Sequence, residues 1–303
     1  MYGLGILFCL CTIASGGYDT VMSSPSFFLK IFTLVSVIGT CFLPPQTVSA
    51  WTKTANFESG TVGVAAQGVS GFDYAGSATT FSSDRAAPGG GMRSAKGVWS
   101  AGDDGWGVVH GEMAYPSPVT TSQQIWMRGY YYFQSPWNWG TNHVKIFRMG
   151  VDPSRGWMSI IGVGGLITTS DEPENVCGPD VFDADTSASF DIDAWQSLEM
   201  YFNMSTTNPI FRVWKNGILI YNRVGLPPHI TCAAGDTSSL SNMMNTWNGG
   251  APQTQTQYMD EFVITTDTPA ARDVANNPMI GPIGWGGTPD TTPPAVPMGL
   301  GVQ

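Results

Sequence analysis

IFRVWKNGILIY, residues 210–221, is typical of two short strands joined by a tight turn. Asn216-Gly217 lies between two apolar segments, and this pair accepts the positive φ angles that a two-residue hairpin needs. Similar apolar or alternating runs, separated by Gly, Pro, Asn and Ser, follow one another from Trp51 to about Gly287. The expected strands are 61–66, 92–99, 106–114, 124–133, 142–149, 157–163, 196–204, 210–215, 217–221 and 257–265. The pattern predicts an all-β protein, a two-sheet antiparallel jelly-roll sandwich.

The composition agrees with a turn-rich β protein and excludes some partners. The 303 residues include 37 Gly and 21 Pro, 42% are hydrophobic, and only 12% are charged. The net charge is −10, and no cluster of Lys and Arg is present, so we expect no nucleic-acid partner. An acidic chain can still bind an anionic polymer, but only through a local cationic cleft.

The N-terminal 50 residues are predicted to be a targeting segment. Residues 26–43 are apolar with one lysine, and the small residues before Trp51 fit cleavage after Ala50. Translation from Met22 gives an ordinary signal peptide, whereas Met1 is the alternative start. Membrane anchoring through residues 3–15 and 26–43, or a lipid on Cys41, are the competing interpretations. We therefore expect a secreted, monomeric protein that has no membrane segment after cleavage.

The mature chain is predicted to hold one domain and a tail. Cys177 and Cys232 are the two cysteines beyond the targeting segment, and in a secreted protein they are expected to form a disulfide rather than two buried thiols. The jelly roll is expected over 51–283. Residues 284–303 are a Pro/Gly/Thr-rich linker that resembles the first strand of a fibronectin type III module, with a disordered tail as the alternative.

Several stretches together resemble a known group of proteins. They are ANFESGTVG, FSSDRAAPGGGMRSAKG, WMRGYYYFQSPWNW, NHVKIFRM, WQSLEMYFNM, FRVWKNGILIY, TWNGGAPQTQTQYMDEFVITTDTP and ARDVANNPMIGPIG. Over about residues 55–283 the chain is similar to the concanavalin A-like jelly-roll superfamily, which includes polysaccharide lyases and laminin-G-like carbohydrate-binding modules. The resemblance implies a glycan-binding concave sheet, and it says less about activity because the same fold carries several chemistries.

Side-chain alternation assigns polar faces to three of the expected strands. In 124–133 one face carries Trp126, Arg128, Tyr130 and Tyr132, opposite the apolar face with Ile125 and Met127. In 142–149 His143 and Lys145 oppose Val144 and Ile146, and in 106–114 His110 and Glu112 oppose Val109 and Met113. If these strands are neighbours, their polar faces line one groove that contains cations and aromatic platforms.

Such a groove suits a polysaccharide, acidic or neutral, because sugar rings stack on aromatic side chains and cations pair with uronate carboxylates. A lyase that acts by β-elimination needs a carboxylate neutraliser, a base and an acid. The predicted neutraliser is Arg128 or Lys145. The predicted base is His143 or His110, and the predicted acid is Tyr130 or Tyr132. Substrate binding is assigned to Trp126, Tyr132, His110 and Glu112.

Each of these residues also has an ordinary structural explanation, such as cross-strand packing of the tyrosines or a surface histidine. The alternatives to a lyase are a non-catalytic carbohydrate-binding module or an adhesion module of a larger extracellular protein. A retaining glycosidase is disfavoured because the chain lacks the ExDxxE pattern of paired carboxylates. The resemblance also implies a structural calcium, for which Glu58 and Asp260 are the expected ligands.

Overall fold

A computed structural model describes residues 49–105, 107–152, 156–172, 181–183, 186–225 and 235–284. The described residues form strands, turns and loops, and none of their segments is a helix long and apolar enough to cross a membrane. Cys177, Cys232 and most of the expected signal peptide and linker lie outside these residues. The predictions for these segments therefore stay predictions.

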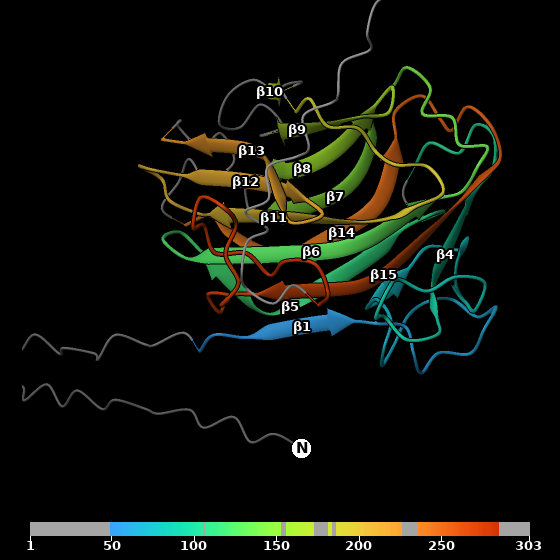
Figure 1. The fold of residues 1–303 in the computed structure, drawn as a ribbon, viewed down its shortest axis with the longest axis horizontal. Helices are drawn as coiled ribbons and strands as arrows, with labels where there is room; N and C mark the ends of the chain where they lie inside the picture. The colour runs from blue at the N-terminus through green and yellow to red at the C-terminus, as the bar shows by residue number, and fades with distance from the viewer. Residues whose placement is uncertain are drawn as a thin grey trace, which may run out of the picture. The chain divides into compact units, whose positions relative to one another are not determined.

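The described strands form two antiparallel sheets, shown in Figure 1. We call the first one sheet A; its strand order is β13-β12-β11-β6-β15-β4-β3, and β1 also pairs with β15. Its strands are β1 (Thr52–Ala55), β3 (Thr79–Ser82), β4 (Ser94–Trp99), β6 (Gln124–Phe133), β11 (Trp195–Asn203), β12 (Ile210–Lys215), β13 (Ile218–Val224) and β15 (Gln255–Thr265).

The second sheet, which we call sheet B, has the strand order β10-β9-β8-β7-β14-β5-β2. Its strands are β2 (Tyr74–Ala75), β5 (Gly111–Thr120), β7 (Val144–Val151), β8 (Gly156–Val163), β9 (Leu166–Glu172), β10 (Val181–Asp183) and β14 (Thr237–Trp247). Neighbours in each sheet include strands far apart in the sequence, such as β14 beside β5 and β7. This arrangement confirms the predicted two-sheet antiparallel sandwich.

The hydrophobic core lies between the sheets and follows the alternation of the sequence. Ile125, Met127 and Tyr131 of β6 face the same core as Val144 and Ile146 of β7, and each is completely buried. The residues between them therefore point to the outer face of their own sheet. The faces assigned within each strand were thus predicted correctly.

The hairpin in residues 210–221 has the predicted register. Lys215 pairs with Ile218 across the turn, and Asn216 and Gly217 have φ angles of 51° and 78°. The Asn216 side chain also accepts a hydrogen bond from the Ser197 backbone N–H at 2.8 Å, which ties the turn to β11. The pair of positive φ angles is the reason why this turn needs Asn-Gly.

Other predictions differ from the structure. Residues 61–66 form turns with one isolated bridge at Ala65, because Gly63 within the segment has a φ angle of 82°, which a regular strand does not contain. Strands β1, β2, β3, β9, β10 and β14 were not predicted. The sequence of β14, TSSLSNMMNTW, is rich in Ser and Asn and is typical of a loop, but neighbours on both sides complete its hydrogen bonds.

A C-terminal strap, residues 267–284, follows β15 and crosses β11 and β6 in the view of Figure 1. Met279 packs in a small apolar cluster with Trp126, Tyr201 and Trp214 on the outer face of sheet A. Asp273 accepts a hydrogen bond from the Trp214 indole N–H at 2.9 Å. This strap covers part of the outer face of sheet A.

Candidate functional site

The predicted site residues divide between the two sheets. Trp126, Arg128, Tyr130 and Tyr132 lie on β6 of sheet A, whereas the other four belong to sheet B or to the residues that lead into its strands. The prediction that the three polar faces line one groove is therefore wrong. Runs 124–133 and 142–149 are consecutive in the sequence, but the chain crosses from one sheet to the other between them, and their polar faces point in opposite directions.

On sheet A the polar face of β6 is bound to the C-terminal strap. Arg128 donates to the backbone oxygens of Gly281 at 2.8 Å and Glu261 at 3.2 Å, and it is 5% exposed. The Tyr130 hydroxyl accepts the Ile283 N–H at 2.7 Å, and the Trp126 indole donates to the Pro278 oxygen at 3.0 Å. These contacts hold the strap in place, and they leave three of the predicted residues covered.

Beneath the strap lies a buried carboxyl group that the sequence analysis did not assign. Glu199 of β11 pairs with Arg128 across the sheet and accepts the N–H groups of Ile280 at 2.6 Å and Gly281 at 2.9 Å. Burial raises the pKa of Glu199 to about 7, although both N–H groups and Arg128 act in the opposite direction. Glu199 therefore serves as an anchor for the strap.

The outer face of sheet B carries a continuous row of polar side chains, which we call the polar row. Each member lies directly opposite the next across five neighbouring strands: Glu112, Asn242, Arg148, Ser159 and Ser170. The residues on either side of Arg148, Phe147 and Met149, face the core, so Arg148 faces outward. A β-bulge after Lys145 keeps that residue on the outer face too, opposite Thr246.

The cations of this face share one carboxylate. Glu172 Oε2 lies 3.0 Å from the Lys145 ammonium and 3.7 Å from Arg148 Nη2. Burial raises the pKa of Glu172, but the charges of Arg148 and Lys145 and the hydrogen bond from Ser170 outweigh it, so the net pKa is lowered. The Arg148 guanidinium also lies over the Trp157 ring, 4.2 Å from its centroid. Both cations are therefore held firmly on the sheet.

Two histidines lie at different places on the same face. His110 precedes β5, its Nε2 is 3.8 Å from Glu112 Oε2, and burial lowers its pKa to about 4. His143 directly precedes β7, two residues before Lys145, and is only partly buried. Burial lowers the pKa of His143, and the charge of Lys145 adds to the effect while Glu172 opposes it. Both imidazoles are thus neutral at pH 7 and able to accept a proton.

Asn242 is the unusual member of the polar row. Its side chain is 1% exposed, and neither its amide nitrogen nor its oxygen has a hydrogen-bond partner among the described residues. A buried primary amide without partners is costly, because its desolvation is not compensated. It lies between Glu112 and Arg148, where a ligand carboxylate or hydroxyl would complete its hydrogen bonds.

The two predicted calcium ligands lie beside the same loop. Glu58 Oε1 accepts the N–H groups of Met92 at 3.0 Å and Arg93 at 2.9 Å, and Asp260 Oδ2 accepts the Ala87 N–H at 2.9 Å. Burial, together with the charges of Glu261 and Glu58, raises the pKa of Asp260 to about 8, although hydrogen bonds from the N–H groups of Ala87 and Glu261 act in the opposite direction. Among the described residues no three His, Cys, Asp or Glu side chains form a metal site. The carboxylates are occupied by loop N–H groups, so the geometry adds no support for calcium, which stays a prediction.

The architecture is that of a concanavalin A-like jelly roll, as the sequence resemblance indicated. No family model and no curated protein matches the sequence. Among solved structures, the chain is similar to an endo-β-1,4-glucuronan lyase from the fungus Trichoderma reesei, with a TM-score of 0.51 and 12% identity over 68% of this chain and 96% of that chain.

Two further structures have the same degree of similarity. The alginate lyase Aly36B matches with a TM-score of 0.51 and 14% identity over 70% of this chain and 96% of that chain. The cellulose induced protein Cip1 matches with a TM-score of 0.50 and 17% identity over 71% of this chain and 97% of that chain. At these identities the comparisons show the fold, and the function must be argued from the side chains.

Arg148, Glu172 and Asn242 were not among the residues predicted from the sequence. Alternation alone places Arg148 on the core face of its strand with Val144 and Ile146, because the bulge that reverses this phase cannot be seen in the sequence. Glu172 and Asn242 lie on β9 and β14, which were not predicted as strands. Asn242 lies between Ser241 and Met243, so no alternation of apolar and polar residues marks it in the sequence.

Proposed function

We propose that the outer face of sheet B binds a uronate-containing polysaccharide and cleaves it by β-elimination. The observation that carries the proposal is the buried, unpartnered amide of Asn242 beside Arg148 in the polar row. An amide and a guanidinium side by side can bind a uronate carboxylate and withdraw its negative charge, which acidifies the C5 proton. Arg148 thus takes the role that was predicted from the sequence for Arg128 or Lys145.

The remaining roles go to the neighbours along β7. His143 is neutral and more accessible than His110, so it is the base that takes the C5 proton. The electron pair of the C–H bond forms the C4–C5 double bond as the C4–O bond breaks. The Lys145 ammonium donates a proton to the leaving oxygen, in place of the tyrosines that lie on the other sheet.

The test is incubation of the protein with a panel of uronate polysaccharides while the absorbance of the unsaturated product is followed. We expect activity on at least one polymer, and weaker binding of that polymer by Asn242→Ala. A panel without any unsaturated product would reject the lyase.

The proposal includes a secreted, monomeric protein, so mass spectrometry of the protein purified from culture medium should find Trp51 at the N-terminus.

A non-catalytic carbohydrate-binding or adhesion module is the second candidate. It is favoured by Glu172, which already pairs with both Lys145 and Arg148 and therefore limits how strongly either cation acts on a substrate. Retained binding of a polysaccharide that gives no product would identify this second function. Comparison of binding and turnover on the same polymer therefore separates the two candidates.

A further inference from the structure

A second in-register row lies on the outer face of sheet A, at the end of β6 away from the strap. We call it the aromatic row. Its members come from four neighbouring strands, and each lies directly opposite the next: Trp195 of β11, Tyr132 of β6, Tyr258 of β15 and Lys96 of β4. Ring centroids are 5.6 Å apart between Trp195 and Tyr132 and 6.0 Å apart between Tyr132 and Tyr258. The proposed function does not use this row.

Arg85 lies across these rings. Its guanidinium carbon is 4.3 Å from the centroid of Tyr132 and 5.7 Å from that of Tyr258, and the residue is exposed to solvent. Among the described residues no carboxylate forms an ion pair with it, and no acceptor takes a hydrogen bond from its N–H groups. Its side-chain contacts are therefore those with the two rings, which fix the plane of the guanidinium and leave its donors to solvent.

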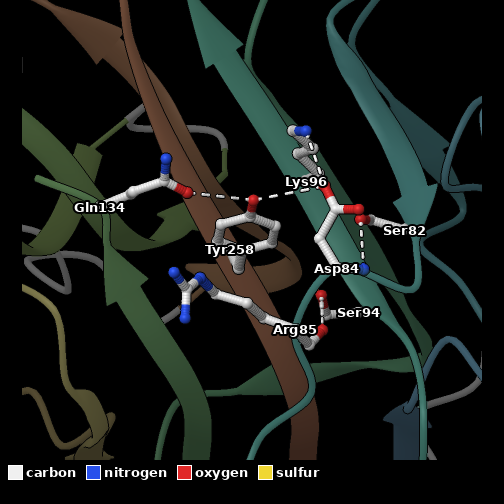
Figure 2. Close-up of polar contacts among 7 residues, drawn as sticks. All are labelled: Ser82, Asp84, Arg85, Ser94, Lys96, Gln134 and Tyr258. Atoms are coloured by element: carbon white, nitrogen blue, oxygen red, sulfur yellow. Dashed lines mark hydrogen bonds and ion pairs between the residues drawn. The ribbon is translucent and has the colours of Figure 1, made fainter.

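The charged and polar groups around Arg85 lie on two sides of the Tyr258 ring. Asp84 is paired with Lys96 at 2.7 Å, and Figure 2 shows both on one side of the Tyr258 ring. Gln134 and the guanidinium of Arg85 lie on the other side, where the Gln134 oxygen accepts from the Tyr258 hydroxyl at 3.2 Å and its amide nitrogen is left as a donor. Asp193, the other nearby carboxylate, accepts from the Tyr132 hydroxyl at 3.2 Å and from the Ser135 N–H at 2.9 Å.

We infer that Arg85, Gln134 and the aromatic row form a second, non-catalytic binding site for the uronic acid residues of a glycan. The forked guanidinium binds the sugar carboxylate with two parallel hydrogen bonds, and the Gln134 amide donates to an adjacent oxygen. Trp195, which is half-buried at the end of the row, supplies an apolar surface for the C–H face of a sugar ring. The inference does not depend on whether sheet B is catalytic.

The experiment titrates the full chain with a hexameric oligogalacturonide by calorimetry. Arg148→Ala is present in every sample, so that sheet B does not contribute. We expect Arg85→Ala to weaken the remaining binding by about tenfold or more, and Arg85→Lys to weaken it by less. Arg212→Ala is the matched control, because Arg212 also lies over a sheet A tyrosine, Tyr201, but already donates to Asn222 at 3.0 Å.

Two ligand controls define the chemical class. A neutral cello-oligosaccharide of the same length should bind far more weakly, and acetate at the same carboxylate concentration should not compete. Equal binding by Arg85→Ala and its parent, with both folded by circular dichroism, would overturn the inference. So would Arg85-dependent binding of the neutral oligosaccharide, or full competition by acetate. Loss of lyase activity in other variants leaves this result unaffected, so failure of one site is distinguishable from failure of the other.

Discussion

The outer faces of the two sheets both bury charged and polar side chains, but they satisfy them differently. On sheet A, Arg128, Glu199 and Tyr130 bond to backbone groups of the C-terminal strap. On sheet B, Arg148 and Lys145 share the carboxylate of Glu172. Asn242 lies between Arg148 and Glu112, and its side-chain amide has no hydrogen-bond partner among the described residues. Arg128 Nε on sheet A also lacks a partner, but among the described residues Asn242 is the one whose side chain leaves two buried polar atoms without one, so we expect sheet B to be the face that binds a ligand.

The largest effect on activity is expected from removal of the proposed base on the sheet B face. His143→Ala should lower turnover by about 10²- to 10⁴-fold, the usual range for removal of a general base. The side chain is partly exposed, so the melting temperature should change little. His110→Ala is the matched control and should reduce turnover far less. Equal losses in both variants would contradict the assignment of the base to His143.

The sheet A arginine should behave in the opposite way. Arg128→Ala removes one hydrogen bond to Gly281 of the strap and one to Glu261 of β15. It also leaves Glu199 buried without its cation, and the total cost should be about 3 kcal/mol of unfolding free energy. Urea denaturation measures this loss. Turnover of the folded protein below the transition should stay near that of the parent. A folded, stable variant without activity would restore Arg128 to the catalytic role predicted from the sequence.

The strap should also make stability depend on pH. The pKa of Glu199 is raised from 4.5 to about 7, so the folded state holds this proton more tightly than the unfolded state. Stability from this group is complete below about pH 4.5 and falls as the pH rises to about 7, by up to roughly 3 kcal/mol. Urea titrations at pH 5 and pH 8 should show the decrease in the parent and less of it in Glu199→Gln.

Asp260→Asn is the control for this measurement, because burial raises the pKa of Asp260 to about 8 and gives the same sign of pH dependence. Each single variant should remove part of the slope, and the double variant should remove more. Stability that rises over this interval in the parent would contradict the assignment of a protonated carboxyl beneath the strap.

The smallest effect is expected at Asn242, and it is the sharpest test of the comparison. Asn242→Ala removes no hydrogen bond to a described residue, so the unfolding free energy should change by less than about 1 kcal/mol or should increase. Affinity for the polysaccharide should fall by about tenfold, which corresponds to one lost hydrogen bond to a charged group. A large loss of stability with unchanged affinity would show that the amide serves the fold.

Local patterns in the sequence were enough for the fold and for the faces of single strands. Asn216-Gly217 determines its hairpin through backbone conformation, and alternation in 124–133 separates core from surface. Which strands become neighbours was not accessible in this way, because β6 and β7 are consecutive in the predicted list but pair with partners far along the chain. A single groove was predicted because the three strands follow one another in the sequence. In the folded chain they are divided between the two sheets, so the groove does not form.

The site itself was half predicted for a related reason. Lys145 lies on the outer face of β7 as the alternation implies, while Arg148 faces outward only because a bulge shifts the phase of β7 by one residue. Asn242 lies on a strand made of residues with low β-propensity, which forms because both of its edges are paired. Bulges and strands imposed by neighbours leave no periodic signal in a single sequence.

The placement of the first and last described segments has a mechanical consequence. β1 pairs with β15 at residues such as Thr52 and Thr265, and the strap is bound to β6 and β11, so both ends of the described domain are attached to sheet A. A pulling force applied through these two ends therefore loads sheet A first. The polar row on sheet B then keeps its geometry until the outer attachments have peeled away.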